Sequence, residues 1–348
     1  MKKECFIFTS DENTYGSIYK VLLNDILSKG NVYFLERTFV FNNKLFDFFK
    51  KILFSTIVNV KTNELVAFKA RKLLINKYSL NKKIEEIAKE YECVNVVLFN
   101  ASIKRYYSAK VLEDIKSKYS NVKLHLFFMD PSTIWASKNA IEIIEDNKSL
   151  FDNIFTVDSN DAREKGWIYW PTPYSKLYIN ISEKTQDLYF CGATKDRHKL
   201  LIKLNNALKS NSVRTQFDVF YIKKNENHLK ELQDNIYVQK LSKMKEYSDT
   251  LKDMISSNCI LELVTPSQSA TFTLRDYEAV VYNKKLLTNN KAIYTFPFYN
   301  ENYMKYFQDI DDIDFKWIKK DIEVDYDYSE NYSPNKLIEE ISRINESR

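Results

Sequence analysis

Apolar positions along the chain alternate between two periods. Short runs rich in Val, Ile, Leu and Phe, such as residues 94–100 (VNVVLFN), are typical of buried strands. Between these runs, apolar residues recur three and four positions apart among lysines and glutamates, as in helices with one buried face. The first half of the chain therefore predicts strands at residues 5–9, 31–36, 94–100, 122–129 and 153–157, and helices at residues 14–28, 44–59, 66–76, 82–91, 109–119 and 141–147.

The same alternation restarts after two closely spaced prolines, Pro171 and Pro173, and a polar stretch over residues 180–186. It predicts strands at residues 187–190, 216–221, 259–264 and 285–288, and helices at residues 197–209, 228–234, 245–256, 273–282 and 334–346. Strands that alternate with helices form mostly parallel sheets covered by helices.

The expected fold class is therefore α/β, with two facing Rossmann-like domains, an interdomain cleft and a C-terminal helix. A chain of 348 residues is longer than one compact core usually holds, which also favours two domains. The boundary is expected near the polar stretch, giving domains over residues 1–180 and 181–348. The last helix is expected to be able to pack back on the first domain.

Glycine is scarce, which excludes two common nucleotide-binding signatures. The chain has only Gly16, Gly30, Gly166 and Gly192. Neither the dinucleotide-binding G-x-G-x-x-G nor the phosphate-binding G-x-x-x-x-G-K-[ST] can be written with these four residues. The four cysteines and three histidines are scattered without metal-ligand spacing, so no metal site is expected, and the thiols are expected to be free in a reducing cytosol.

The charge balance is mild. Lys and Arg number 52 against 47 Asp and Glu, a formal net charge of +5, which is short of the strongly basic character of nucleic-acid binders. Asp11 and Glu12 end the first apolar run too early for a signal peptide. No apolar run reaches the ~18 residues that a membrane-spanning helix needs. We expect a soluble, cytoplasmic protein that does not bind nucleic acid.

Ligands of open α/β sheets bind beyond the carboxyl ends of the strands, so polar residues at those positions are the candidates for function. Asp130 directly follows the predicted strand 122–129 and could act as a general base or orient a hydroxyl group. From the residues alone, the favoured interpretation is that it caps the turn or helix that follows. For Asp158 and Asp161, which follow the strand at 153–157, turn and capping roles are favoured.

A third candidate is the segment FCGATKDRHKLL. Gly192 opens a turn after a strand, and Lys195, Arg197 and His198 gather at the start of the next helix. Cations oppose the positive end of the helix dipole unless an anion such as phosphate is bound there. Solvated surface charge is the alternative interpretation.

The fourth candidate extends over residues 259–290. A predicted strand leads into a polar loop with Gln268, Ser269 and Thr271, and then into a helix that carries Arg275 and Glu278 on one face. A diphosphate needs N–H donors and a cation, and a ribose needs a carboxylate for its two hydroxyls. The loop and these two side chains could supply both, although an ordinary Arg–Glu surface pair would have the same spacing.

The fourth segment resembles the signature of bacterial GT-B glycosyltransferases of capsule and lipopolysaccharide assembly, in the CgeB-like group. Those proteins carry a Q-S-G-L-T-x-R-x-x-E-A loop and helix followed by K-K-L-I-T-x-N. The corresponding residues here are Gln268, Ser269, Thr273, Arg275, Glu278, Ala279, Lys284, Lys285, Leu286, Leu287, Thr288 and Asn290. The chain departs from the pattern in that the Gln-Ser pair lies one residue further from the arginine and the loop contains no glycine.

Other segments agree with the resemblance and keep its order from about residue 94 to residue 295. FCGATKDRHKLL is similar to the family's F-x-G-x-x-x-x-R-x-x-x-L, which covers Gly192 and Arg197. FFMDPS resembles the segment with the strand-end aspartate of the first domain, here Asp130. FDNIFTVDSNDA resembles an F-D-x-x-F-x-F-D-x-x-D-A segment that leads to the interdomain crossing.

The resemblance implies a metal-independent enzyme that transfers a sugar from a nucleotide-sugar, its substrate rather than a cofactor, to a glycan or lipid-linked acceptor. It places Glu278 on the ribose, and Arg275, Arg197 and the 268–271 loop near the diphosphate. Asp130 would face the acceptor as the catalytic candidate. The implied donor-binding set is Gly192, Lys195, Arg197, Gln268, Ser269, Thr271, Arg275, Glu278 and Asn290.

Two alternatives remain open at this point. The glycine-free loop is also compatible with a non-catalytic nucleotide- or glycan-binding protein of the same shape. The basic and aromatic stretch over residues 44–83 could contact an anionic membrane at its inner face, or it could be the solvated side of ordinary helices.

Overall fold

The computed structural model describes residues 2–10, 16–36, 80–100, 109–134, 137–147, 149–180, 183–194, 197–221, 232, 236, 238–240, 245–265 and 271–347. The predicted helices at residues 44–59 and 66–76, and nearly all of the basic stretch, lie outside these residues. So do Lys195, Gln268, Ser269 and most of the predicted helix at 228–234.

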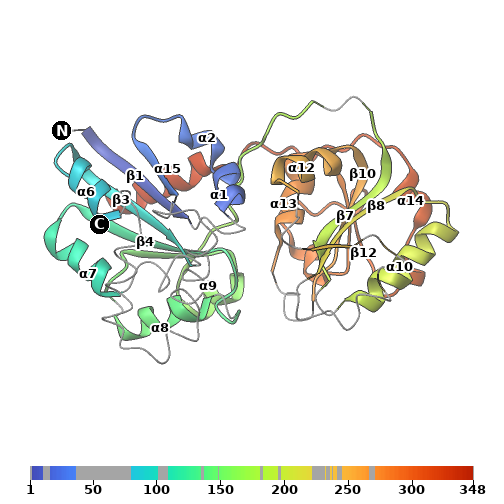
Figure 1. Ribbon diagram of the computed structural model, residues 1–348, viewed down its shortest axis with the longest axis horizontal. Coiled ribbons are helices and arrows are strands. Elements are labelled where there is room, and N and C mark those ends of the chain that lie inside the picture. The colour runs from blue at the N-terminus through green and yellow to red at the C-terminus, as the bar shows by residue number, and fades with distance from the viewer. Residues whose placement is uncertain are drawn as a thin grey trace, which may run out of the picture. The chain divides into compact units, whose positions relative to one another are not determined.

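The chain forms two compact units (Figure 1). The first consists of Met1–Pro171 together with Leu337–Arg348, and the second of Thr172–Lys336. The boundary predicted at residue 180 falls inside the second unit, because the preceding segment is hydrogen-bonded there. The N–H of Tyr174 donates to the carbonyl of Tyr332 at 2.8 Å, and the N–H of Leu177 donates to the hydroxyl of Tyr282 at 3.0 Å.

The first unit is a parallel sheet with helices on its faces. Within the described residues, its strand order is β2-β1-β3-β4-β5-β6. The strands are β1 (Lys2–Ser10), β2 (Val32–Glu36), β3 (Tyr91–Phe99), β4 (Val122–Phe128), β5 (Asn153–Thr156) and β6 (Ile168–Tyr169). The helices are α1 (Gly16–Leu22), α2 (Asn24–Leu27), α6 (Leu80–Ile87), α7 (Ala109–Lys118), α8 (Lys138–Asp146), α9 (Ser159–Lys165) and α15 (Pro334–Glu346).

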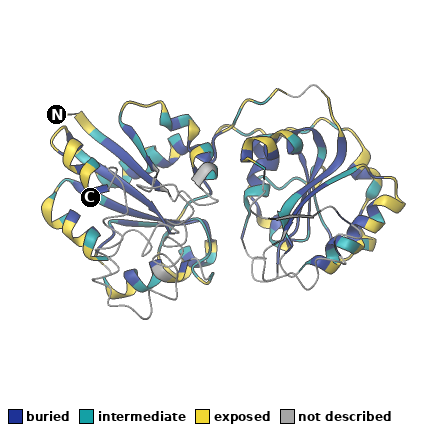
Figure 2. Cartoon of the chain, in the orientation of Figure 1, coloured by how far each residue is buried: buried dark blue, intermediate teal, exposed yellow. Residues whose placement is uncertain are grey.

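The second unit is another parallel sheet, with the order β12-β11-β10-β7-β8-β9 in its described residues. Its strands are β7 (Gln186–Ala193), β8 (Thr215–Tyr221), β9 (Val238–Lys240), β10 (Ser257–Glu262), β11 (Lys285–Thr288) and β12 (Met304–Tyr306). Its helices are α10 (His198–Ser210), α12 (Tyr247–Ile255), α13 (Leu274–Val281), α14 (Phe315–Lys319) and the short 3-10 helices η6 (Lys291–Thr295) and η7 (Ile310–Asp312). In each unit the strands are the buried centre and the helices turn their polar sides outward (Figure 2).

The helix α15 returns to the first unit after the chain has completed the second. In Figure 1 it is the red helix among the blue and green elements. Leu337 and Ile341 are fully buried, and the Asn345 amide donates to Asn95 Oδ1 of β3 at 2.8 Å. Asn95 also accepts at 3.0 Å from the buried His125 of β4, so the last helix covers a polar row on the sheet.

Most predicted elements are confirmed, with differences at particular places. The helix expected over residues 14–28 is broken at Leu23 into α1 and α2. The helix expected at 82–91 ends at Ile87, because β3 begins at Tyr91. Element α9 lies where turn or capping roles were predicted and α14 lies in the acidic segment from Asp309, while no element was predicted for β12.

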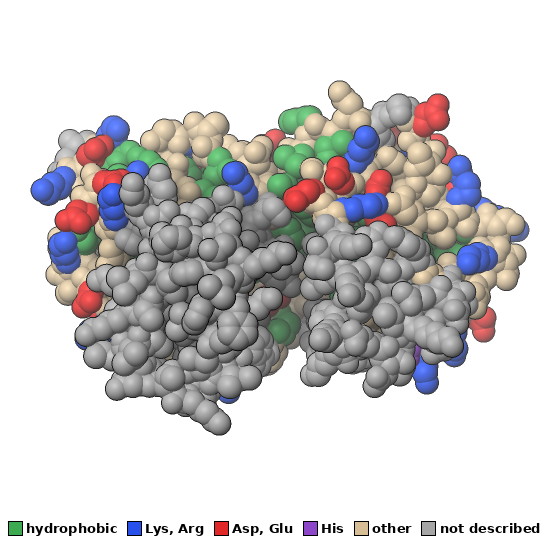
Figure 3. Space-filling view, in the orientation of Figure 1, with side chains coloured by type: hydrophobic (Ala, Val, Ile, Leu, Met, Phe, Trp, Pro, Cys, Tyr) green, Lys and Arg blue, Asp and Glu red, His purple; other side chains and the backbone are tan. Residues whose placement is uncertain are grey.

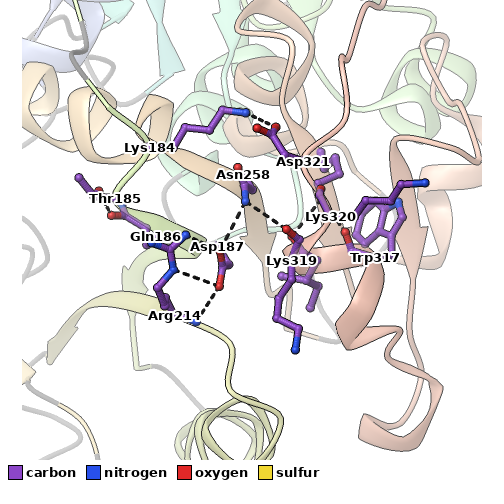
Figure 4. Close-up of polar contacts among 12 residues, drawn as sticks. Lys184, Thr185, Gln186, Asp187, Arg214, Asn258, Trp317, Lys319, Lys320 and Asp321 are labelled. Carbon is purple, nitrogen blue, oxygen red and sulfur yellow. Dashed lines mark hydrogen bonds and ion pairs between the residues drawn. The ribbon is translucent and has the colours of Figure 1, made fainter.

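Side chains of the second unit tie together the amino ends of β7 and β10 (Figure 4). Asp187 accepts from the backbone N–H of Arg214 at 2.9 Å and from its guanidinium at 2.8 Å, while Lys184 forms an ion pair with Asp321. Asn258 donates to Asp187 at 3.5 Å. These groups pair with one another, which indicates a structural role for this edge, and a functional site is expected at the opposite edge.

Candidate functional site

The strand order of the second unit defines one position for a ligand. Strand β7 comes first in the unit, β8 and β9 follow on one side of it, and β10, β11 and β12 lie on the other. The order therefore reverses between β7 and β10, which are paired in parallel. In open parallel sheets, ligands bind beyond the carboxyl ends of the strands at this reversal. Gly192 and Ala193 end β7 there, and Glu262 ends β10.

Gly192 and Arg197 fit against each other at this edge. A Cβ atom on Gly192 would lie 3.0 Å from Arg197 Nη2 and 3.1 Å from Phe190 Cζ, so both neighbours would have to shift by a few tenths of an ångström. The Arg197 guanidinium lies 5.5 Å from the centroid of the Phe190 ring and donates to the carbonyl of Ala193 at 2.8 and 3.1 Å. The absence of a side chain at residue 192 thus creates the space that the guanidinium occupies.

Arg197 is a partly buried cation without an ion-pair partner among the described residues. Burial lowers the pKa of its guanidinium to about 10, and the negative charge of Glu262 opposes that shift. Arg197 is also the N-cap residue of α10, and its own side chain does not cap the helix. A partly desolvated cation beside a helix N-terminus is an arrangement that a phosphate group would stabilise.

The N-terminus of α13 differs, because the chain satisfies it internally. Thr273 accepts from the N–H of Arg275 at 3.1 Å, and Asp276 accepts from the N–H of Thr273 at 2.5 Å, which completes a capping box. Thr273 also donates its hydroxyl to Glu262. Of these two helix starts, the one at α10 is therefore better suited to bind an anion.

A buried pair of carboxyl groups, Glu262 and Asp276, lies beside this capping box. Glu262 accepts from the hydroxyl of Thr288 at 2.5 Å, and Asp276 is fully buried. Burial first, and then the charge of Glu262, raises the pKa of Asp276 well above its ordinary value. Asp276 therefore retains a proton at higher pH than an exposed aspartate, which limits the negative charge at this edge.

Arg275 and Glu278 contact each other, as their spacing predicts, but inside the protein. Their side chains are 17% and 0% exposed and form an ion pair. The second carboxylate oxygen of Glu278 accepts from the hydroxyl of Tyr247 at 2.5 Å. The Tyr247 hydroxyl is also hydrogen-bonded to the hydroxyl of Tyr174, at 3.1 Å. Burial lowers the pKa of Arg275 and the charge of Glu278 raises it, with a net upward shift. Both Glu278 oxygens are thus engaged within the chain, where the sequence predicted a ribose contact.

Asn290 and Thr271 support the loop before α13. The Asn290 amide donates to the carbonyl of Thr271 at 2.8 Å, and its oxygen accepts from the N–H of Ala292 at 3.1 Å. Asn290 is fully buried and Thr271 is 8% exposed. Asn290 therefore contacts the backbone of Thr271, just before α13, and caps η6. Gln268, Ser269 and Lys195 lie outside the described residues.

In the first unit, Asp130 follows β4 at the carboxyl edge of the sheet and is partly exposed. The capping interpretation is confirmed for Asp158, whose side chain accepts from the N–H groups of Asn160 and Asp161 at 2.8 Å. Asp161 has a different role from the predicted turn or cap. Its buried carboxylate accepts from the backbone and the hydroxyl of Ser132, which fixes the loop after Asp130.

Sequence reasoning missed Glu262, Asp276 and Tyr247. The signal for Glu262 was available, since it is the one charged residue inside the apolar run CILELV. A carboxylate in such a run needs buried donors, and here Thr273 and Thr288 supply them. Asp276 and Tyr247 gave no comparable signal, because their partners come from other elements.

Over the residues that the structure describes, no group of three or more His, Cys, Asp and Glu side chains is arranged to hold a metal ion. Within the same residues, no helix has the length and hydropathy needed to cross a membrane. On the face shown in Figure 3, basic and acidic side chains are interspersed over the described surface.

The sequence matches no protein-family model, and no curated protein is similar to it in sequence. The fold, in contrast, is similar to that of solved structures along nearly the whole chain. One is a mutant of TarM from S. aureus in complex with fondaparinux, α-GlcNAc-glycerol and UDP, with a TM-score of 0.57 at 10% identity over 98% of this chain and 99% of that one.

A second similar structure is HepE from Anabaena in complex with UDP-glucose, with a TM-score of 0.55 at 9% identity over 99% of this chain and 100% of that one. A third is S. aureus MnaA with UDP, with a TM-score of 0.50 at 11% identity over 98% and 96% of the two chains. At such identities the likeness concerns the fold alone. The chain has the GT-B fold of two parallel α/β units, as the sequence predicted.

Proposed function

We propose that the protein is a glycosyltransferase that moves a sugar from a nucleotide-sugar donor to a glycan or lipid-linked acceptor in bacterial surface polysaccharide assembly. The observation that carries the proposal is Arg197, a cation without a carboxylate partner among the described residues, at the start of α10, which its own side chain does not cap. It lies where the strand order of the second unit reverses. The solved complexes of TarM, MnaA and HepE with UDP or UDP-glucose support the choice of donor class.

In this proposal the diphosphate lies against Gly192, with Arg197 and the N–H groups of α10 stabilising the charge that develops on the leaving group. Lys195, Gln268 and Ser269 are assigned to the same site by the sequence. Glu278 and Arg275 stabilise the buried part of this unit through their ion pair. Glu278 would bind a ribose only after it loses its contact to Arg275 or to Tyr247. Asp130 remains the acceptor-side catalytic candidate, and no metal is required.

The test is UDP binding by isothermal titration calorimetry to wild type and to Arg197→Gln. Loss of a charge-assisted contact to phosphate costs about 2 kcal/mol, so UDP affinity should fall about thirtyfold. Arg214→Gln is the matched control, because it removes an arginine of the same unit at the opposite sheet edge. Equal affinities of the two variants for UDP would contradict the proposal.

The second candidate is a non-catalytic nucleotide- or glycan-binding protein, favoured by the glycine-free loop before α13. Hydrolysis or transfer of the sugar from UDP-glucose separates the two. An enzyme should release UDP slowly from UDP-glucose even without an acceptor, in the presence of EDTA. UDP binding without any release would favour the binding protein.

A further inference from the structure

Three tyrosine rings gather on the surface of the second unit, on η6, on β12 and on the loop between them. Tyr294 contacts Tyr299 in a T-shaped arrangement with 5.2 Å between the ring centroids, and its centroid lies 5.8 Å from that of Tyr306. Tyr294 is 50% exposed, and the other two rings are partly exposed. Exposed aromatic side chains that gather in one place mark an interaction surface.

This tyrosine cluster is held in place by buried neighbours. Ile293 and Phe296 are buried and anchor η6, and the N–H of Tyr299 donates to the carbonyl of Phe296 at 2.9 Å. Tyr306 is in register with Thr288 on the neighbouring strand β11. Rings whose positions are already fixed lose little conformational entropy when a ligand binds, so the cluster is prepared for one.

The tyrosine cluster lies at the carboxyl edge of the second sheet, which is also the edge of the candidate donor site. Tyr306 is the last residue of β12, and η6 directly follows β11. Strands β11 and β10 separate β12 from β7, so the ends of β12 and β7 are three strand spacings, ~14 Å, apart. The cluster is therefore on the edge that binds ligands in open α/β sheets, but separate from Arg197 and the start of α10.

The chemistry of the tyrosine cluster matches that of a sugar. Tyrosine rings provide apolar surface for the C–H face of a pyranose. None of the hydrogen bonds among the described residues involves the hydroxyl of Tyr294, Tyr299 or Tyr306, so each can donate to or accept from a sugar hydroxyl. Partial burial first, and then the charge of Tyr294, raises the pKa of Tyr299, which keeps its hydroxyl protonated and able to donate.

The charge around the rings separates a sugar from the other ligands that stack on tyrosine. Bases of single-stranded nucleic acid also stack on aromatic rings, but their backbone needs positive charge. Residues 291–314, which carry all three rings, include five acidic and two basic residues, a formal charge of −3. One of the two basic residues, Lys305, forms an ion pair with Asp314 at 3.2 Å. This surface therefore repels a polyanion, whereas a neutral glycan meets no such repulsion.

We propose that Tyr294, Tyr299 and Tyr306 form a surface site for a neutral pyranose ring, with the C–H face of the sugar against an exposed tyrosine ring. Pyranoses with equatorial hydroxyls, such as β-glucose, present their C–H bonds on the faces of the ring and suit such a surface. The site lies apart from the proposed donor site. Only the identification of the bound glycan with the acceptor rests on the proposed function.

The test is saturation-transfer NMR titration of the full chain with cellotetraose, a neutral chain of β-glucose, and with a thymidylate octamer. We expect cellotetraose to bind at least tenfold more tightly than the octamer. Tyr294→Ala should weaken cellotetraose binding at least fivefold, whereas Tyr294→Phe, which keeps the ring, should stay within about twofold of wild type. Tyr178→Ala is the matched control, because it removes a tyrosine of the same unit that is 89% exposed and lies outside the cluster.

Absence of cellotetraose binding, tighter binding of the thymidylate octamer, or equal cellotetraose affinities of Tyr294→Ala and Tyr178→Ala would each overturn the inference. So would a Tyr294→Phe variant that binds as weakly as Tyr294→Ala. UDP affinity, measured on the same samples, should be unchanged in all three variants. Normal UDP binding without cellotetraose binding refutes only the saccharide site, whereas cellotetraose binding without UDP binding refutes only the proposed donor.

Discussion

At the scale of single residues, Gly192 determines where the candidate site has its positive charge. Its φ angle is outside the left-handed region, so glycine is needed for space rather than for backbone conformation. The Arg197 guanidinium occupies that space, over the Phe190 ring. A residue with a Cβ atom would press on the guanidinium and shift it by a few tenths of an ångström.

We therefore expect Gly192→Ala to weaken UDP binding about tenfold, equivalent to about 1.4 kcal/mol, while the protein stays folded. Crowding against Arg197 and Phe190 should also cost about 1 kcal/mol of unfolding free energy. Calorimetric titration with UDP and thermal denaturation measure the two effects. Gly30→Ala is the control, since a Cβ atom there has no neighbour within 4 Å. Unchanged UDP affinity in Gly192→Ala would show that Arg197 does not contact the nucleotide.

The sequence identified Gly192 and Arg197 because a strand, a turn and a helix follow one another over a few residues. It could not show that Glu278 is engaged by Tyr247, since those residues come from α13 and α12 and their contact depends on how two helices pack on the sheet. Nor could the sequence show that the N-cap side chain caps α13 but does not cap α10. Thr273 and Asp276 form their box next to Thr271, whose carbonyl accepts from Asn290, a residue well separated from them in the sequence.

At the scale of elements, β10 and β11 carry an unusual lysine between them. Lys284, directly before β11, is 8% exposed and donates to the carbonyl of Ser257, the first residue of β10, at 2.9 Å. Burial lowers the pKa of its amine to about 8, with a smaller contribution from the charge of Lys184, while Asp321 opposes the shift. The folded protein therefore disfavours the charged form of Lys284.

This shift predicts how stability changes with pH. Between about pH 8 and the ordinary lysine pKa of 10.5, the unfolded chain binds the proton and the folded protein does not, so stability rises with pH. Relative to Lys284→Met, the wild type should gain on the order of 2 to 3 kcal/mol of unfolding free energy between pH 7 and pH 10.5. Urea denaturation at several pH values measures this difference.

The control for the pH experiment is Lys199→Met, an exposed lysine on α10 of the same unit. Its difference from wild type should stay constant over the same pH range. A constant difference for Lys284→Met as well would mean that its amine is protonated in the folded protein throughout, in contradiction to the burial argument.

The alternation of strands and helices was predictable because the spacing of apolar residues that distinguishes a strand from a helix is visible within a short stretch of sequence. Strand order and the reversal between β7 and β10 were not, since a sequence pattern does not reveal which strands pair. The short elements β12 and α14 escaped detection because one turn of helix or three residues of strand give too few positions for a period. Their stability comes from tertiary contacts, such as the hydrogen bond from Trp317 to the carbonyl of Asn302 at 2.9 Å.

At the scale of the whole molecule, the second unit is inserted into the first. In the first unit, α15 buries its own Leu337 and Ile341 and covers the polar row that includes Asn95 and His125. A sequence pattern predicts such a helix but not the unit to which it belongs, because its partners lie more than two hundred residues away in the chain.

Removing residues 337–348 should therefore destabilise the first unit and leave the second nearly unchanged. Loss of the two buried aliphatic side chains alone costs at least ~4 kcal/mol. Hydrogen exchange followed by mass spectrometry reports the units separately, and we expect faster exchange in β3 and β4 but not in β7 and β10. Deletion of residues 347–348 is the control. Faster exchange in both units, or in neither, would contradict the assignment of α15 to the first unit.

The chain leaves the first unit after Pro171 and returns to it at Leu337, and this determines the order in which the parts of the two units are synthesised. Every strand of the unit between them is synthesised before the first residue of α15 that packs on β3. Domains usually fold as they emerge, beginning with the one nearest the N-terminus. In this chain the N-terminal sheet is synthesised long before the helix that covers Asn95 and His125, so the first unit can complete its fold only after the inserted unit has been made.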